Sequence, residues 1–283
     1  MDWVKRLNEA VDYLEEHLDE EIDYARAAKI ACCSAYHFQR MFTYMAGFPL
    51  SEYIRRRRMT LAAAELQAGG KIVDVALKYG YESPTAFNRA FQGVHGFAPS
   101  LVREAGAVLH ACSRIRFHIT IQGAEDMEYR LEKKDAIRIV GVARKLEREV
   151  EKNFDTVPSM WQQVVTDGTL GRIAALMDAE PKAILGVSAC GDEDDWRYFI
   201  AAASTQPAQE PFEEYIVPAA TWAVFAGQGT NLSIQELERR IVTDWLPSSG
   251  YEYAKGPDME VYYNADPANA SYEVWIPVVK AEK

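Results

Sequence analysis

The sequence predicts a multidomain protein, with an all-α double helix-turn-helix domain followed by an α+β domain of two related strand-helix-strand-strand halves. Three observations lead to this fold class. The chain has 283 residues, which at roughly 100–200 residues per domain indicates about two domains. A helical unit occurs twice before residue 110, and from residue 127 apolar and polar residues alternate as in half-buried strands. We therefore expect domains at 1–110 and 127–283, with a linker at 111–126.

Composition and charge narrow the class of protein. Hydrophobic residues make up 48% and charged residues 26% of the chain, which is ordinary for a globular protein. No apolar run approaches the roughly 18 residues that a membrane span needs, so we expect a cytoplasmic protein. The net charge is −11, yet residues 24–110 hold eleven Lys and Arg against five Asp and Glu. A basic segment in an acidic chain is expected when one domain meets phosphate and the other does not.

The cysteines give no sign of a metal site or a disulfide framework. Cys32, Cys33, Cys112 and Cys190 fit neither a CxxC metal pair nor paired spacings, so we expect no metal, no other cofactor and a reducing compartment.

The helical repeat has an offset of 49 residues. Ser34, Phe38, Arg40, Phe42, Gly47 and Phe48 recur as Ser83, Phe87, Arg89, Phe91, Gly96 and Phe97. Six identities in about fifteen positions imply two copies of one supersecondary element. Each copy is predicted to be two short helices around a tight turn, which is a helix-turn-helix.

Local signals place the helices of both copies. In the second copy an apolar face over 72–79 ends at Gly80, and Ser83 then caps a helix that has Pro84 in its first turn and runs to about residue 94. In the first copy we expect helices at 22–30 and after Ser34. The expected core positions share the i, i+4 spacing of one buried face; they are Phe38, Phe42, Phe87 and Phe91.

One rigid helix over residues 50–67 is expected to connect the copies, because the segment has no internal Gly or Pro. It carries four consecutive arginines, residues 55–58, which point in several directions around the helix. At least one of them should pair with an internal acid; the alternative for the run as a whole is a solvated face.

These motifs resemble the AraC/XylS family of transcription regulators. The match is carried by Gly80-Tyr81-Glu82-Ser83-Pro84-Thr85-Ala86-Phe87-Asn88-Arg89-Ala90-Phe91, by Gly96-Phe97-Ala98-Pro99, by residues 53–59 and by residues 37–42. It covers roughly residues 5–107 and departs from the family at Cys32-Cys33 and at His95.

The resemblance implies that two recognition helices enter successive major-groove segments of double-stranded promoter DNA. The residues carried over by motif position are Tyr36, His37, Gln39, Arg40, Thr85, Ala86, Asn88 and Arg89. Arg40 and Arg89 are the best candidates for bidentate contacts to guanine. For His37 and Asn88 the alternative is a polar residue on a solvent face. Two such units in one chain favour a monomer, and RNA polymerase is a further candidate partner.

In the second half of the chain the sequence pattern predicts a strand, a helix and further strands, and this order occurs twice. Strands are expected at 127–131, 137–142, 183–189, 198–203, 214–217, 222–227, 259–263 and 272–279, with 114–119 a further candidate in the linker. One helix has Pro158 near its start and Met160, Trp161, Val164 and Val165 on its inner side; a second is opened by Ser233 as a capping box. This order is typical of an α+β domain.

Three motifs in this half are similar to the GyrI-like effector-binding domain. They are Met127-Glu128-Tyr129 with Ile139-Val140-Gly141-Val142, then residues 218–225, and Ser271-Tyr272-Glu273-Val274-Trp275-Ile276-Pro277-Val278. The resemblance, over about residues 127–280, implies an aromatic pocket that holds one buried acid, here Glu273. Candidate walls are Trp161, Tyr198, Trp222, Tyr262 and Trp275. Trp161 and Trp222 could instead be plain core, and Glu273 a solvated strand residue.

We therefore predict a sequence-specific DNA-binding transcription regulator whose second domain binds a small hydrophobic effector, as in multidrug sensing. A cation suits one carboxylate among aromatic rings. Two alternatives stay open for this domain. It could bind a protein partner, or it could be a hydrolase in which Glu273 is the base and Tyr198 or Tyr262 the acid. The sequence has no GxSxG, HExxH or P-loop motif, so we expect no enzyme and no catalytic residue.

Overall fold

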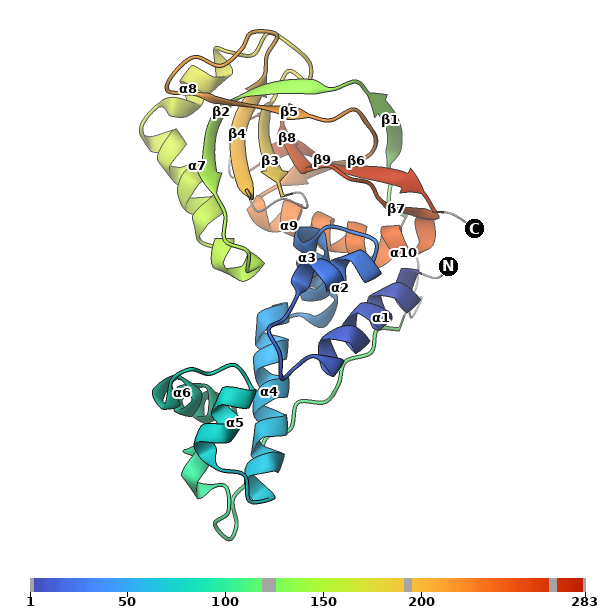
Figure 1. The fold of residues 1–283 in the computed structure, drawn as a ribbon. Helices are drawn as coiled ribbons and strands as arrows, with labels where there is room; N and C mark the ends of the chain where they lie inside the picture. The colour runs from blue at the N-terminus through green and yellow to red at the C-terminus, as the bar shows by residue number, and fades with distance from the viewer. Residues whose placement is uncertain (1–2, 119–125, 191–194, 265–268, 282–283) are drawn as a thin grey trace.

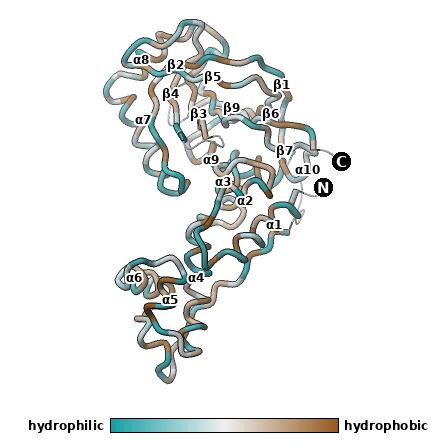
Figure 2. Tube along the Cα trace, in the orientation of Figure 1, coloured by the Kyte–Doolittle hydropathy of each residue, from teal (hydrophilic) through white to brown (hydrophobic). Residues whose placement is uncertain are grey.

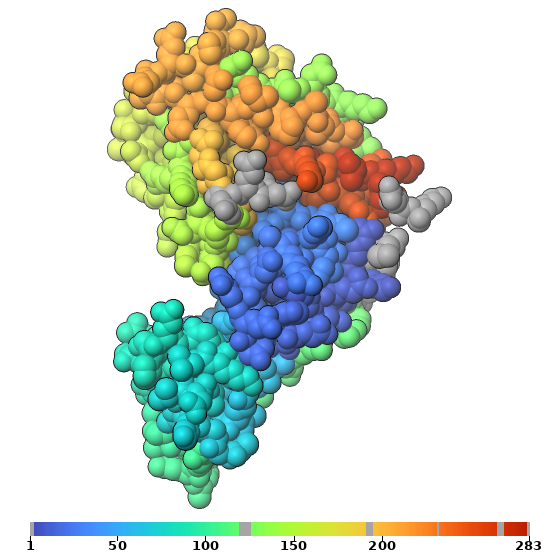
Figure 3. Space-filling view, viewed as in Figure 1, coloured from blue at the N-terminus to red at the C-terminus, as the bar shows by residue number. Residues whose placement is uncertain are grey.

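The computed structural model describes residues 3–118, 126–190, 195–264 and 269–281. Figure 1 shows a helical lobe of α5 and α6 at one end of a long helix, α4, while α2 and α3 at its other end lie against the strand-rich domain. The space-filling view has a narrow waist between the α5–α6 lobe and the rest of the molecule (Figure 3). Among the described residues no helix has the length and apolar character to span a membrane.

The first domain consists of helices whose ends follow the predicted caps. They are α1 (Trp3–Glu16), α2 (Tyr24–Ile30), α3 (Ala35–Ala46), α4 (Leu50–Gln67), α5 (Ile72–Lys78), α6 (Pro84–His95) and the 3-10 turn η1 (Pro99–Leu101). The hydroxyls of Ser34 and Ser83 accept hydrogen bonds from the first turns of α3 and α6, as predicted. Helix α2 begins two residues later than expected because Asp23 is its N-cap. The four repeat phenylalanines are fully buried, which confirms the predicted core.

Helix α5 is less buried than its pattern predicted. It is coloured as hydrophobic over much of its length (Figure 2) and buries Val75 and Ala76, but Val73 and Leu77 are 55% and 59% exposed. Val73 therefore does not belong to the inner face to which the sequence pattern assigned it.

The arginine run on α4 is tied into the helical domain. Arg57 Nη2 lies 2.7 Å from Glu15 Oε2 on α1, which confirms a pair with an internal acid. Arg58 donates to the carbonyl oxygen of Leu18 at 2.7 Å. The chain after α6 packs back along this domain, where Phe117 exchanges two hydrogen bonds with the Asn8 side chain. Residues 114–118 form no strand, and residue 119 lies outside the described part of the chain.

The second domain is a nine-stranded antiparallel sheet with helices between its strands. The strands are β1 (Arg130–Lys134), β2 (Ile137–Lys145), β3 (Ile184–Ala189), β4 (Arg197–Ala203), β5 (Glu213–Val217), β6 (Ala220–Gly229), β7 (Tyr251–Tyr253), β8 (Asp258–Tyr262) and β9 (Ala270–Lys280). The helical elements are η2 (Val150–Asn153), α7 (Thr156–Thr166), α8 (Thr169–Ala174), α9 (Asn231–Arg240), a π-helical turn η3 (Ile241–Trp245) and α10 (Leu246–Ser249).

The sheet order shows the two related halves that the sequence predicted. The order is β1-β6-β9-β8-β3-β4-β2-β5, with β7 on β9. One half supplies β2, α7, β3 and β4, the other β6, α9, β8 and β9, and the two meet where β3 pairs with β8. The predicted strands are confirmed to within a few residues at their ends, whereas α8 and β7 were not predicted.

Two details of the helices differ from expectation. Thr230 caps α9, and Ser233 is the third residue of the helix, where its hydroxyl accepts from the Thr230 amide at 3.2 Å. The capping box is therefore real but begins three residues earlier than predicted. In α7, Met160 and Val164 are buried, while Val165 is 61% exposed and not on the inner side.

The strand register assigns side chains to the two faces of the sheet. Residues directly opposite each other in antiparallel strands project from the same face, and neighbours along a strand alternate. Glu260 lies opposite Val274 and Gly186, and Val261 lies opposite Glu273. Residues of the face shared with Glu260 contact α3, α7 and α9; we call it the helical face. Its strand residues include Gly186, Ser188, Tyr198, Asp258, Glu260 and Tyr262.

Candidate functional site

Helix α3, the recognition helix of the first copy, lies on the helical face of the sheet domain (Figure 1). The Tyr36 hydroxyl donates to Ser188 Oγ at 3.0 Å, and the Tyr36 ring packs edge-on against Trp196. The Gln39 amide donates to the carbonyl oxygen of Arg148 at 2.9 Å. Tyr36 and Gln39 are therefore buried by the second domain, at 8% and 2% exposure.

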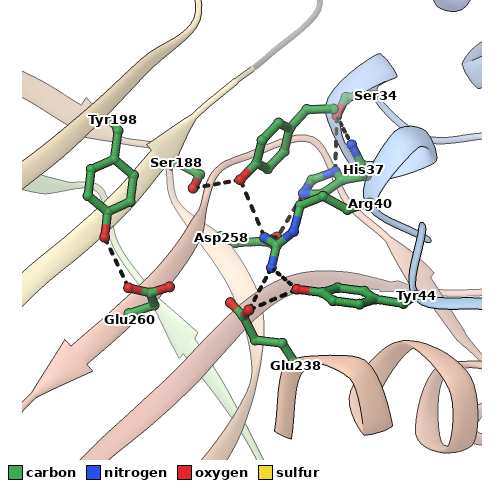
Figure 4. A network of polar contacts seen from close by, with 10 residues as sticks. Ser34, His37, Arg40, Tyr44, Ser188, Tyr198, Glu238, Asp258 and Glu260 are labelled. Atoms are coloured by element: carbon green, nitrogen blue, oxygen red, sulfur yellow. Dashed lines mark hydrogen bonds and ion pairs between the residues drawn. The ribbon is translucent and has the colours of Figure 1, made fainter. Parts of the chain in front are cut away.

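Arg40 of α3 lies between two carboxylates of the second domain (Figure 4). Its guanidinium is 3.1 Å from Asp258 Oδ2 on β8 and 2.8 Å from Glu238 Oε2 on α9. It donates to the Tyr44 hydroxyl at 2.9 Å, and that hydroxyl donates to Glu238 at 3.0 Å. The guanidinium carbon also lies over the rings of Tyr36 and Tyr44, at 5.4 and 5.5 Å from their centres. We call Asp258, Glu238, Tyr44 and the nearby Tyr253 the cation cage.

His37, on the same helix as Arg40, also contacts two residues of the cation cage. Its Nε2 is 3.1 Å from Asp258 Oδ1, its Nδ1 is 3.1 Å from Ser34 Oγ, and its ring stacks on Tyr253 with centres 4.1 Å apart. At 3% exposure, His37 is not the solvent-facing polar residue that was its alternative.

The electrostatics of the cage favour its charged forms. Burial alone lowers the pKa of Arg40, but the negative charge of Glu238 and the neighbouring tyrosines and Asp258 raise it above the ordinary value. Burial raises the pKa of Asp258, and the nearby His37 and Arg40 outweigh this effect and lower it. The pair is therefore a buried ion pair with its hydrogen bonds satisfied, of the kind in which removing one partner leaves an uncompensated charge.

Little space is left around Arg40. The cavity lined by Arg40, Tyr44, Glu238, Tyr253, Asp258 and the apolar side chains of η3 and β9 has a volume of about 10 Å³. Such a space holds about one water molecule, whereas small-molecule sites take roughly 300–1,000 Å³. The side chains of α3 thus fill this part of the helical face.

A further carboxylate, the half-buried Glu260, lies next to the cage on β8 (Figure 4). Its Oε2 accepts from the hydroxyls of Tyr198 at 3.0 Å and Tyr262 at 2.9 Å. The Trp161 indole donates to the Tyr198 hydroxyl at 3.0 Å. Burial, together with the charge of Glu238, raises the pKa of Glu260 to about 7, although the two tyrosine hydrogen bonds oppose the shift. This arrangement holds a carboxyl group that changes charge near neutral pH among aromatic rings.

Sequence reasoning missed Asp258 and Glu260. A signal was available, because Asp258, Glu260 and Tyr262 alternate along a strand and so share one face. Glu238 could not be found in this way, since its approach to Asp258 depends on how α9 packs on the sheet.

The six predicted effector residues do not form one pocket. Trp161, Tyr198 and Tyr262 lie together beside Glu260 on the helical face. Trp222, Glu273 and Trp275 project from the opposite face, because Val261 and not Glu260 is the partner of Glu273. The prediction of a single pocket is therefore wrong, and its cause is the register of β8 on β9.

Glu273 is neither a pocket acid beside Tyr198 nor a solvated residue. It is 8% exposed and accepts from the Trp275 indole at 2.8 Å and the Tyr263 hydroxyl at 2.9 Å. Its other oxygen is 2.8 Å from Arg130. The proposed hydrolase pair of Glu273 with Tyr198 or Tyr262 is likewise not formed. Glu273 projects from one face of the sheet, and the two tyrosines project from the other. Trp222 is fully buried core.

The two sets of predicted DNA-reading residues have opposite surroundings. On α6, Thr85, Ala86 and Arg89 are exposed and Asn88 is half-buried. On α3, Tyr36, His37 and Gln39 are buried and Arg40 is held in the cage. Arg89 has no ion-pair partner among the described residues, whereas its repeat equivalent Arg40 has two.

Comparison with known proteins identifies both parts of the chain. The model of the GyrI-like small molecule binding domain matches residues 127–279, more than half of the chain, and the chain belongs to this family. A helix-turn-helix domain model matches residues 27–105. The protein is thus a DNA-binding transcription regulator with a small-molecule-binding domain at its C-terminal side.

Two relatives match nearly the whole chain, and a third matches its N-terminal part. The chain is 25% identical to the right origin-binding protein of Escherichia coli K12 over 281 residues, 95% of this chain and 94% of that one. It is 24% identical to the transcriptional regulator Rob of Salmonella typhimurium, over 98% and 99% of the two chains. The activator AarP of Providencia stuartii is 37% identical over 98 residues, 34% of this chain and 73% of its own length.

Proposed function

We propose that this regulator reads promoter DNA with α3 and α6 and that its second domain senses a hydrophobic cation on the helical face. The observation that carries the effector class is Glu260, a half-buried carboxyl group that accepts hydrogen bonds from Tyr198 and Tyr262 and is flanked by Trp161. Aromatic faces attract a cation, burial of a hydrophobic ligand recovers apolar area, and a carboxylate neutralises the charge. A neutral ligand of the same shape would gain only the burial of apolar area.

The pKa of Glu260 gives the proposal a pH dependence. In the free protein Glu260 is largely protonated below about pH 7. A bound cation favours the carboxylate, so binding must release a proton at low pH and becomes tighter as the pH rises.

For DNA we propose the residues already named on α3 and α6, with Arg40 and Arg89 as the guanine-reading side chains. We also propose the division into residues 1–110, 111–126 and 127–283. Two helix-turn-helix units joined by the rigid α4 support binding as a monomer, since one chain supplies both recognition helices.

The test of the effector class is a tryptophan-fluorescence titration of the full chain with tetraphenylphosphonium and with neutral triphenylphosphine oxide. We expect saturable quenching by the cation, about tenfold weaker binding in Glu260→Gln, and tighter binding at pH 8 than at pH 6. Glu273→Gln is the matched control, because Glu273 is buried on the opposite face. Equal binding of both compounds, or an effect of Glu273→Gln alone, would contradict the proposal.

Glu260 also keeps the hydrolase alternative open in a changed form. A carboxyl group with a pKa near 7 that touches two tyrosine hydroxyls resembles a general base with a neighbouring acid. Product formation from activated esters that Glu260→Gln abolishes would favour catalysis. Binding without turnover favours the sensor, in line with relatives that are transcription regulators.

A further inference from the structure

We propose that Arg40 acts as an internal ligand of the effector domain, so that effector binding and DNA reading by α3 are coupled. A hydrophobic cation that occupies the helical face would displace Arg40 and its helix, and the released α3 would then enter the major groove. This inference rests on the proposed function and adds the mechanism by which one domain controls the other.

The first argument is that the docked surface of α3 is its predicted DNA-reading surface. Tyr36, Gln39 and Arg40 point into the second domain and contact Ser188, the Arg148 carbonyl and Asp258. A recognition helix reads base edges with the side chains that face the groove. The same side chains cannot face the second domain and DNA at once, so the docked arrangement blocks the first helix-turn-helix.

The second argument is chemical. The Arg40 guanidinium is a cation between two buried carboxylates, with aromatic rings over and beside it. A hydrophobic cation would be recognised by the same features, which are negative charge and ring faces. The acids facing this position come from one half of the domain, Asp258 and Glu260 from β8 and Glu238 from α9, whereas Arg40 and His37 come from α3. Release of α3 therefore leaves three acids without the Arg40 guanidinium that lies between two of them, Glu238 and Asp258.

The third argument is space. With α3 in place the cage retains about 10 Å³, too little for a drug-sized ligand. Departure of Tyr36, Arg40 and Tyr44 would open the face between α7 and α9, next to Glu260. Cation binding of this kind and α3 docking are thus mutually exclusive, which is what a coupling between two sites requires.

Only one of the two DNA-reading helices, α3, is blocked by docking on the second domain. Arg89 is exposed on α6, which lies at the far end of α4 from the sheet domain (Figure 1). In the docked state only the second helix-turn-helix is free to bind DNA. Release of α3 should extend the contact from one half-site to two.

One experiment measures promoter-DNA affinity of the full chain after the cage acids are neutralised. Asp258→Asn and Glu238→Gln should each raise affinity about tenfold, within the range of site-to-site couplings, because they weaken docking and leave α3 unchanged. Glu214→Gln is the charge-matched control, since Glu214 pairs with Arg138 on the sheet and does not contact α3. Equal gains in DNA affinity in all three variants would show that the gain comes from the change in net charge alone, and would overturn the proposal.

A second experiment keeps the proposal testable if those variants fold poorly. Arg40→Ala should bind tetraphenylphosphonium about tenfold more tightly than the wild type, because the internal competitor is gone, while the repeat-matched Arg89→Ala should not. Hydrogen exchange of residues 35–46 should quicken when the cation is added to the wild type. Cation binding with unchanged affinity in Arg40→Ala and unchanged exchange in α3 would overturn the inference and leave the proposed effector class intact. If no cation bound any variant, the effector class would fail, while a DNA-affinity gain confined to Asp258→Asn and Glu238→Gln would still support the blocking contact.

Discussion

Arg40 and Arg89 occupy the same position in the two copies of the helical repeat, and their surroundings decide what each can do. Arg89 is exposed and free to meet DNA, whereas Arg40 is neutralised by two carboxylates of another domain. Sequence comparison within the chain could equate the two side chains, because the i, i+4 phenylalanines fix which helical face is inward. It could not separate them, because the two carboxylates that hold Arg40 lie about 200 positions further along the chain.

Arg89 gives the prediction for DNA reading. Arg89→Ala should weaken specific DNA binding by about 1–3 kcal/mol and relax preference at one base position, as expected for the loss of a bidentate guanine contact. The measurement is a binding titration against a set of single-base variants of the target site. A uniform loss across all sequences would instead assign Arg89 to the phosphate backbone.

Glu260 gives a stability prediction whose sign follows from its raised pKa. Between about pH 4.5 and 7 the folded chain holds a proton on Glu260 that the unfolded chain has released. The free energy of unfolding contributed by this group is therefore greatest below that window and falls as the pH rises through 7. Denaturant unfolding at pH 5, 6, 7 and 8 should show this decline in the wild type relative to Glu260→Gln; a parallel pH dependence in the two proteins would contradict it.

At the level of elements, most of the fold could be predicted because its signals are local. Ser34 and Ser83 mark helix starts by their side-chain hydroxyls, and Gly80 and Gly96 mark helix ends by their positive φ. The period of apolar residues separates helices from strands. The three-residue strand β7 could not be predicted, since it exists through its pairing with β9. The prediction of a single pocket failed for the same reason, because the register of β8 on β9 is a long-range property.

The close pairing of β3 with β8 is itself testable at Gly186. A Cβ added there would collide with the Tyr198 hydroxyl and lie 2.8 Å from Glu260 Oε2, so Gly186→Ala should separate these two groups. We expect a loss of about 1–3 kcal/mol in stability, the usual cost of overpacking, and weaker cation binding. Gly171→Ala in α8 is the control, because its Cβ meets nothing within 4 Å. Equal stability of the two variants would show that the sheet can adjust.

At the scale of the whole molecule, the contact between the two domains includes one helix, α3, whose predicted DNA-reading side has two uses. The sheet domain holds α3 by its DNA-reading side, while α4 carries the second helix-turn-helix away from it (Figure 1, Figure 3). This arrangement predicts that the number of phosphate contacts changes with the state of α3. The dependence of DNA affinity on salt concentration should become steeper when tetraphenylphosphonium is added, because a second half-site releases further counterions. An unchanged slope would mean that the same surface contacts DNA in both states.

The most direct test of the central claim is DNA affinity measured with and without tetraphenylphosphonium, in the wild type and in Asp258→Asn. If the cation displaces α3 from the cage, it should raise the affinity of the wild type about tenfold and have little effect on the variant, in which α3 is already released. A cation that binds the protein but leaves the DNA affinity of the wild type unchanged would contradict the coupling between the two domains.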